Sequence, residues 1–157
     1  MKIKRGLELT SVIVGALYFL SVSAFAVLPP KVYEERVDKS KIKAIAVVKD
    51  IKVVDHYNSV DDKQITFTLI KSFGEIAPPK IFMGRCESVN KRWFEHGPGV
   101  GGDIYYYPNK NDEVYVTIAE NGSEITSYTK LTDDLKQALS DDFKKVKTKI
   151  GTAYVGK

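Results

Sequence analysis

Two reactive side chains, Cys86 and His96, stand ten positions apart near the middle of the chain. A cysteine paired with a histidine can supply a thiolate nucleophile, so one hypothesis is a small hydrolase or another thiol-dependent enzyme, with Glu87 as a further polar group. The spacing matches no family signature and identifies no residue that would orient the histidine. Cys86 is also the only cysteine, so the alternative is a buried structural thiol. We expect no catalytic residue and keep the thiol enzyme as the alternative.

Three other patterns could be mistaken for chemical sites. Asp55-His56 stands at a strand end, where a solvated pair is more common than a general base. The stretch 97–102 satisfies G-x-G-x-x-G, but a dinucleotide site needs a helix directly after it, and Asp103 with a run of tyrosines follows instead. One cysteine and two histidines, without marked carboxylates, do not make a zinc site. We therefore expect no metal and no cofactor.

Aromatic and cationic side chains gather in residues 91–94 and again in three successive tyrosines. Such side chains can stack on bases, cover a core, or form a patch that binds a partner. The expected partner-binding residues are Arg92, Trp93, Phe94, Tyr105 and Tyr107.

The first 26 residues have the organisation of a secretory signal peptide. Three basic residues precede an apolar stretch, and Ser23-Ala24-Phe25-Ala26 places small residues at the −3 and −1 positions of a cut after Ala26. The apolar stretch is roughly 12–16 residues, short of the ~20 that span a bilayer as a helix. An uncleaved anchor and a buried N-terminal helix are the alternatives. We expect a periplasmic or secreted protein that begins at Val27.

Cleavage would change the charge of the protein as well as its length. It removes three basic residues and one acidic residue, so the formal net charge falls from +4 to +2. A charge this small gives no argument for nucleic acid or for an anionic membrane as a partner. We expect neither partner after cleavage.

The candidate reactive and partner-binding residues are expected to be positioned by β-strands. Alternating or β-branched patterns predict strands at 44–54, 64–73, 80–83, 113–118 and 124–128, and residues 84–102 are expected to form a long loop. Asn121-Gly122 is the preferred pair for a type I′ turn between the last two strands. Thr132 followed by two aspartates predicts a helix start, with Leu135 and Leu139 on its apolar face.

The domain organisation follows from these elements. Residues 27–43 are expected to be an irregular lead-in or a short helix, residues 44–157 a single β-rich domain, and 150–155 a final short strand. Short strands joined by tight turns favour a mainly β fold, a small antiparallel barrel or sandwich of five or six strands with a C-terminal helix.

Two stretches resemble the OB-fold barrel of tissue-inhibitor-of-metalloproteinase-like domains. Residues 44–54 followed by FTLIKSFG at 67–74 are similar to that family's paired strands A-x-A-V-V-x-x-x-V and F-x-V-x-K-x-F-K-G, and 102–107 is similar to its G-x-x-Y-L-V-Y strand. The resemblance covers about a third of the mature chain and implies an OB-like barrel and protein binding. The eukaryotic inhibitors chelate zinc through an N-terminal cysteine and contain disulfides. The expected N-terminus here is Val27, so metalloproteinase inhibition is not carried over.

Together these observations favour an exported, non-catalytic binding module. The 84–102 loop is long and contains several glycines and the paired aromatics Trp93 and Phe94. We therefore expect this loop, with the adjacent strand face, to contact a protein partner or a component of the cell envelope. The thiol-dependent enzyme and a structural subunit of an envelope assembly are the other two hypotheses.

Overall fold

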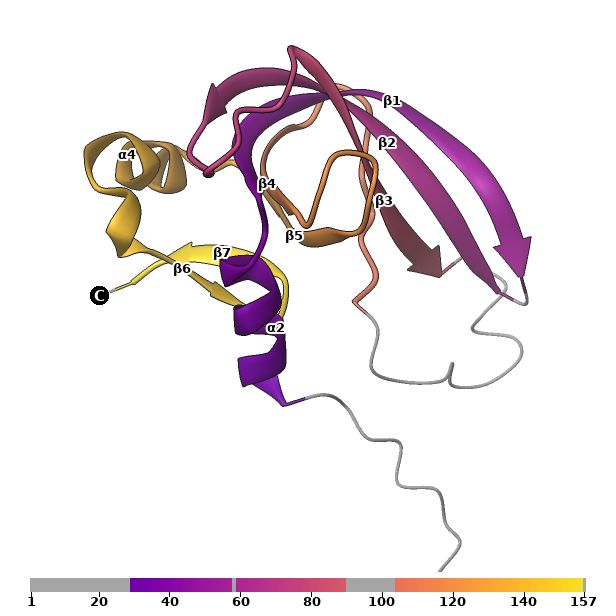
Figure 1. The fold of residues 1–157 in the computed structure, drawn as a ribbon, viewed down its shortest axis with the longest axis horizontal. Coiled ribbons are helices and arrows are strands. Elements are labelled where there is room, and N and C mark those ends of the chain that lie inside the picture. Colours follow the sequence, from indigo (N-terminus) through magenta and orange to yellow (C-terminus); the bar gives the residue numbers. More distant parts are fainter. Residues whose placement is uncertain (1–28, 58, 90–103, 157) are drawn as a thin grey trace, which may run out of the picture.

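The computed structural model describes residues 29–57, 59–89 and 104–156, which form a mainly β fold (Figure 1). The predicted signal peptide lies outside these residues. Within them, no helix is both long and apolar enough to cross a membrane. The elements in chain order are α2 (Pro30–Asp38), β1 (Ile42–Tyr57), β2 (Val60–Ser72), β3 (Ile81–Val89), β4 (Glu113–Ile118), β5 (Ile125–Lys130), α4 (Asp133–Asp141), the 3-10 turn η1 (Phe143–Lys145), β6 (Val146–Lys149) and β7 (Thr152–Val155).

Five strands form one antiparallel sheet in the order β3-β2-β1-β4-β5, and β6 and β7 form a separate hairpin. The long β1 pairs with β2 from Ala44 to Tyr57 and with β4 from Ile42 to Val47. Three register shifts along β1 and β2 add the local bending that bulges produce. Two isolated parallel bridges join the outer strand β3 to residues outside the named strands, Arg85 to Glu124, which directly precedes β5, and Glu87 to Tyr105. The sheet therefore curls so that β3 approaches the start of β5. Among the described strands, the continuous ladder does not close into a barrel.

The main core lies inside this curved sheet. Every second residue at the start of β1 points inward, which buries Ala44, Ala46 and Val48. Phe67 and Phe82 stack there with ring centroids 5.2 Å apart. Gly84 lets β3 approach β5, because a Cβ at this position would lie 2.7 Å from Cγ1 of Ile125.

A second core covers the outer face of β1 and β4. Ile45 and Tyr115 are buried there against Leu135 and Leu139 of α4. Phe73, from just after β2, stacks on Phe143 at 5.1 Å in the same cluster. Burial on both faces explains why the start of β1 is an apolar run rather than an alternating one.

The C-terminal helix begins as predicted. Thr132 Oγ1 accepts a hydrogen bond from the amide of Leu135 at 3.3 Å, and two aspartates follow in the first turn. The short helix foreseen for the lead-in is α2, which buries Tyr33 and Val37. The final strand is β7, whose partner β6 the sequence pattern did not predict.

Three local predictions were wrong. Residues 84–89 belong to β3 and not to a long loop, and 90–103 lie outside the described residues. The tyrosine run does not form a strand, since only Tyr105 makes an isolated bridge. Asn121-Gly122 does not form a type I′ turn, because only Gly122 of the pair has a positive φ (83°), as in a type II turn. The type I′ requirement for two positive φ angles is met instead by Ile150 and Gly151.

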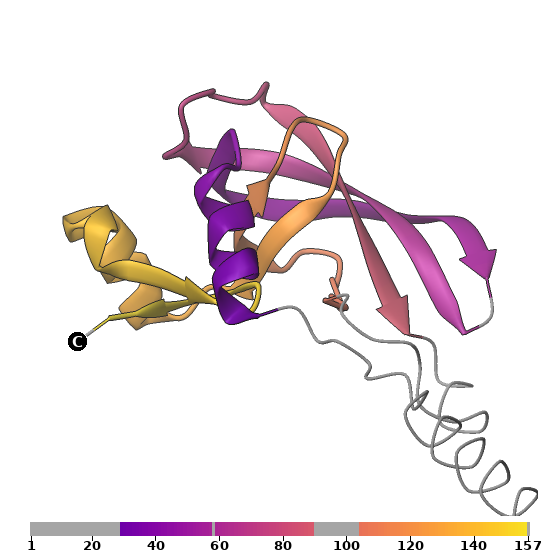
Figure 2. The same cartoon turned by 60° about the horizontal axis from the view of Figure 1, so that its bottom comes forward.

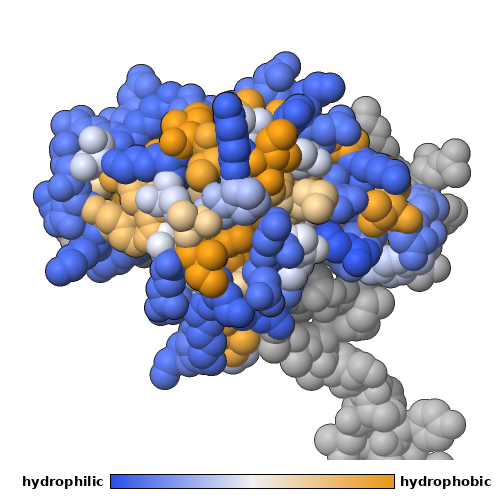
Figure 3. Space-filling model, turned by 45° about the horizontal axis from the view of Figure 1, so that its top comes forward, coloured by the Kyte–Doolittle hydropathy of each residue, from blue (hydrophilic) through white to orange (hydrophobic). Residues whose placement is uncertain are grey.

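The far half of the β1–β2 hairpin extends away from α2 and α4 (Figure 2). Val53 and Tyr57 are about half exposed there. On the outer face of β2 and β3, Ile70, Ile81 and Met83 are also exposed. Figure 3 shows one face of the molecule on which hydrophobic side chains are interspersed with hydrophilic ones.

Candidate functional site

A cleft with a volume of about 540 Å³ opens where the two outer strands of the sheet meet. β3 meets its neighbours here only at two isolated bridges, Arg85 with Glu124 just before β5 and Glu87 with Tyr105, and not through a continuous ladder. We call this feature the seam cleft. Its lining residues are Asp62, Arg85, Cys86, Glu87, Ile104, Tyr106, Gly122, Ser123, Glu124 and Ile125.

The β4–β5 turn forms one wall of the seam cleft and is fixed to β3 by hydrogen bonds. Asn121 Oδ1 accepts from the amide of Met83 at 2.9 Å, and the amide of Gly122 donates to the Met83 carbonyl at 2.8 Å. The amide of Arg85 donates to the Ser123 carbonyl at 2.8 Å. Because these bonds satisfy backbone groups on the free side of β3, they hold the wall in place.

Tyr106 forms the opposite wall. Its amide donates to the Glu87 carbonyl at 2.9 Å, and its carbonyl accepts from the hydroxyl of Ser88. Its own hydroxyl donates to the Thr126 carbonyl at 3.0 Å. Burial raises the pKa of Tyr106 well above its ordinary value, with a smaller contribution from Glu124, so the hydroxyl remains a hydrogen-bond donor at neutral pH.

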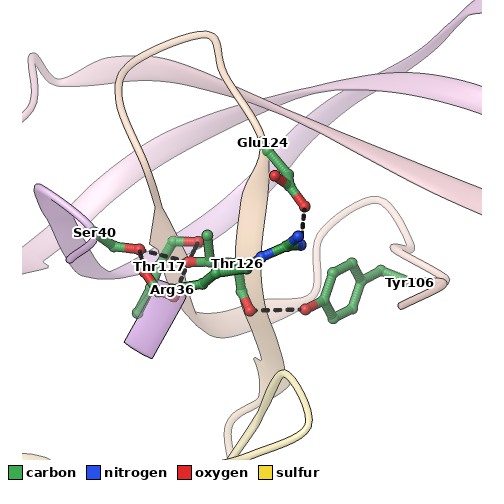
Figure 4. A network of polar contacts seen from close by, with 6 residues as sticks. All are labelled: Arg36, Ser40, Tyr106, Thr117, Glu124 and Thr126. Carbon is green, nitrogen blue, oxygen red and sulfur yellow. Dashed lines mark hydrogen bonds and ion pairs between the residues drawn. The ribbon is translucent and has the colours of Figure 1, made fainter. Parts of the chain in front are cut away.

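A buried hydroxyl network behind this wall connects the sheet to α2 (Figure 4). Ser40 Oγ and Thr126 Oγ1 are 2.6 Å apart, and Thr126 Oγ1 lies 2.7 Å from Thr117 Oγ1. Ser40 also donates to the carbonyl of Arg36 at 2.8 Å. The Arg36 guanidinium reaches the Glu124 carboxylate at 3.4 Å, at the mouth of the seam cleft. The helix therefore helps to position a charged group of the site.

The seam cleft is acidic although the whole chain is basic. Three carboxylates and one guanidinium line it, which gives a formal charge of −2. The guanidinium of Arg85 pairs with Asp62, and this contact raises the pKa of Arg85. Glu87 Oε1 accepts a hydrogen bond from the Tyr57 hydroxyl at 2.7 Å.

Cys86 lines the inner side of the seam cleft and belongs to the main core. Burial raises its pKa to about 12, with smaller contributions from Asp62 and Glu87. A thiol nucleophile acts as its thiolate, so burial of Cys86 disfavours the reactive form at neutral pH. The prediction of a buried structural cysteine is confirmed. His96 lies outside the described residues, so its distance from Cys86 is not described.

The other titratable candidates are not in the seam cleft. His56 Nδ1 lies 2.6 Å from Asp61 Oδ1 near the tip of the β1–β2 hairpin, where the histidine is exposed. In the described part of the chain, no three His, Cys, Asp or Glu side chains are grouped to hold a metal ion.

The predicted partner-binding residues fall into two groups. Arg92, Trp93 and Phe94 lie outside the described residues. Tyr105 is bridged to Glu87 beside the seam cleft, and Tyr107 is 60% exposed just beyond it. Tyr106, the wall residue between them, had not been selected.

The sequence analysis also missed the charged residues of the seam cleft. Arg85 and Glu87 are two apart on one strand, so their shared face could have been recognised had β3 been predicted at full length. Their proximity to Asp62 and Glu124 depends on strand register, which no local pattern reveals. Comparisons with protein-family models, curated proteins and solved structures found no match to this chain.

Proposed function

We propose that this chain is an exported, non-catalytic binding module that holds a protein partner at the seam cleft and the adjoining 84–102 segment. The observation that carries the proposal is the seam cleft itself, which is lined jointly by β3, the segment of Tyr106 and the β4–β5 turn. Residues 90–103 join the end of β3 to the wall segment beginning at Ile104, and they include Arg92, Trp93 and Phe94. The expected contact residues therefore belong to the segment that connects β3 to the Tyr106 wall.

The proposal includes a fold of the OB type. The sheet order β3-β2-β1-β4-β5, with a parallel bridge between Arg85 of β3 and Glu124 just before β5, supports a five-stranded, partly open barrel. This is the fold implied by the resemblance to tissue-inhibitor-of-metalloproteinase-like domains.

A protein partner fits the seam cleft better than a nucleic acid does. Nucleic-acid sites attract phosphates with lysine and arginine. The charge of the seam cleft has the opposite sign, because Asp62, Glu87 and Glu124 outnumber Arg85. A protein can offer complementary cationic and apolar side chains to such a surface.

Site-specific photo-crosslinking in living cells tests the binding module. A benzoyl-phenylalanine residue is introduced at Glu124 or at Tyr107, and the matched control position is Gln137 on the exposed face of α4. We expect both seam positions to give an adduct with the same envelope or secreted protein and Gln137 to give none. Absence of seam adducts, or equal adducts at all three positions, would contradict the proposal.

Export has a separate test. We expect the protein recovered from the periplasm or the medium to begin at Val27, as read by N-terminal sequencing. Substitution of Ala24 and Ala26 by bulky residues would block the cut and retain residues 1–26. Recovery of an intact N-terminus in the cytoplasmic fraction of wild-type cells would exclude an exported protein.

A further inference from the structure

Partner recognition at the seam cleft must use side chains. On β3, the amide and carbonyl of Met83 and the amide of Arg85 are bonded to the β4–β5 turn, and the Glu87 carbonyl accepts from Tyr106. Adding a partner as a further strand needs unpaired backbone groups along an edge. The backbone groups at these positions are already paired, so the partner must be recognised through the shape and charge of side chains.

The seam cleft combines an apolar floor with an acidic rim. Ile125, Tyr106 and Cys86 are buried at its base. Glu124 stands at the rim with 64% of its side chain exposed, and Glu87 of β3 also lines the cleft. Lysine and arginine have the complementary form, an aliphatic stem with a charge at its end.

The rim carboxylates differ in their ion pairs. Asp62 is paired with Arg85, and Glu124 is paired with Arg36 at 3.4 Å. Among the described residues Glu87 forms no ion pair, and its hydrogen bond comes from the uncharged Tyr57 hydroxyl. Glu87 is therefore the rim carboxylate whose charge is left uncompensated.

The charge acts on the groups at the base of the seam cleft. Asp62 and Glu87 both raise the pKa of Cys86, and Glu124 raises the pKa of Tyr106, in addition to the larger effect of burial. Lys63 and Arg36 act in the opposite direction on these two groups. A cation entering the seam cleft thus meets carboxylates from β2, β3 and the β4–β5 turn.

From this arrangement, which rests on the proposed binding function, we infer that the seam cleft receives a lysine or arginine side chain of the partner, with Glu87 as its counter-charge. The stem lies against Ile125 and Tyr106, and the cationic end reaches the rim. The contact is a single charged pair at a partly exposed site. A short peptide carrying one such residue therefore binds with a dissociation constant on the order of 1 mM.

The test is an NMR titration of the naturally processed, ¹⁵N-labelled protein. The probes are the peptide acetyl-Gly-Gly-Arg-Gly-Gly-amide and the same peptide with citrulline, which preserves the shape and removes the charge. We expect the arginine peptide to shift the amides of Glu87, Glu124 and Tyr106 and to bind about tenfold more tightly than the citrulline peptide. Its affinity falls as salt is added.

Glu87→Gln supplies the matched variant. The amide oxygen can still accept from Tyr57, so the fold is kept while the charge is lost, and an unchanged spectrum of the free variant verifies this. We expect about fivefold weaker binding of the arginine peptide. Glu75→Gln, at an exposed position outside the seam cleft, serves as the control and keeps wild-type affinity. Equal binding of the two peptides, shifts outside the seam cleft, or no effect of Glu87→Gln would overturn the inference.

The crosslinking experiment separates this inference from the binding function. If the partner adduct at Tyr107 forms as well in Glu87→Gln as in the otherwise native chain, the cationic pocket is wrong and the binding module stands. If the adduct at Tyr107 does not form even when Glu87 is retained, the proposal of a binding module is itself wrong. A much reduced adduct in Glu87→Gln, with a normal adduct in Glu75→Gln, supports both.

Discussion

Ile150 adopts a left-handed backbone conformation, with a φ of 46°, in the two-residue turn between β6 and β7. A β-branched residue is an outlier in this region, and the left-handed conformation costs L-residues about 1–2 kcal/mol. The side chain is 45% exposed, so little packing compensates the cost. Asn111 shows that asparagine takes such a conformation in this chain, with a φ of 70°.

Ile150→Asn is therefore expected to stabilise the protein by about 1 kcal/mol. The measurement is the midpoint of urea unfolding, which should rise with an unchanged m-value. Gly151→Ala is the contrasting variant, because a Cβ there would lie 2.3 Å from the Tyr106 hydroxyl oxygen. A lower midpoint for Ile150→Asn would show that the turn depends on contacts of the isoleucine.

The Cys86 thiol is expected to resist alkylation. With a pKa of about 12, its thiolate fraction at pH 8 is so small that iodoacetamide reacts more than about a thousandfold more slowly than with free cysteine. Reaction at the normal rate in urea would show that folding is the cause. Rapid reaction of the native protein would restore the hypothesis of a thiol-dependent enzyme.

At the scale of single residues, the sequence predicted what depends on near neighbours. The cap at Thr132 was predicted because hydroxyl and acidic residues act within one helical turn. The burial of Cys86 was the favoured expectation because a lone cysteine cannot form an intramolecular disulfide, with pairing to another chain as the alternative. The pair of Arg85 with Asp62 could not be predicted, since 22 residues separate them and only the β2–β3 register brings them together.

At the scale of elements, α4 depends on its first turn. Thr132→Ala removes the acceptor for the Leu135 amide and is expected to cost about 1 kcal/mol. Thr132→Ser keeps a hydroxyl and should lose far less. Urea unfolding of the two variants makes the comparison. Equal losses would mean that the methyl group matters and the cap does not.

The contact of the β4–β5 turn with β3 is a second element-scale prediction. Asn121→Ala leaves the Met83 amide without its acceptor and is expected to cost about 1–2 kcal/mol. Hydrogen exchange of that amide should become faster by about tenfold or more. Asn121→Asp retains an oxygen at the same place and is the control. Slow exchange in both variants would show that the turn is held by Gly122 and Ser123 alone.

The strands illustrate where periodicity is informative. β2 and β4 were found because their alternation, or their dense apolar run, is visible within the strand itself. The predicted third strand ended at Met83, because the glycine and charged residues that follow are typical of a loop, whereas β3 continues to Val89. In the fold, Gly84 is required by the close approach of Ile125, and Arg85 and Glu87 occupy the solvent-facing side of an outer strand. The signals that resembled a loop were consequences of tertiary position.

At the scale of the whole molecule, the two cores share β1 and β4. Phe82 belongs to the inner core and Leu139 to the outer one. Because β1 is buried on both faces, we expect the cores to unfold together in one cooperative transition.

Phe82→Ala is expected to cost about 3–5 kcal/mol and Leu139→Ala about 2–5 kcal/mol. In each variant the far-UV and near-UV circular dichroism transitions in urea should coincide at a lower midpoint. Tyr115 in the outer core contributes to the near-UV signal. A near-UV transition that precedes the far-UV one in Leu139→Ala would show that the outer core opens alone.

The arrangement of the sheet was the part least accessible to sequence. A mainly β fold with one late helix was predicted because composition and spacing are local properties. The placement of β1 between β2 and β4, and the meeting of β3 with β5, depend on contacts between distant segments. The acidic charge of the seam cleft is a product of those contacts, since a chain with a net charge of +4 gives no sign of it.

The bonding of the β4–β5 turn to β3 also bears on how the protein avoids self-association. A sheet edge with free backbone groups is a template on which identical chains can stack into fibrils. In this molecule the Met83 and Arg85 amides are already engaged by the turn, and the amide of Tyr128 on β5 donates to Gly151 of the β6–β7 hairpin at 3.0 Å. The backbone groups at these positions of both outer strands are thus engaged by the chain's own turns, which leaves them unable to pair with a strand of an identical chain.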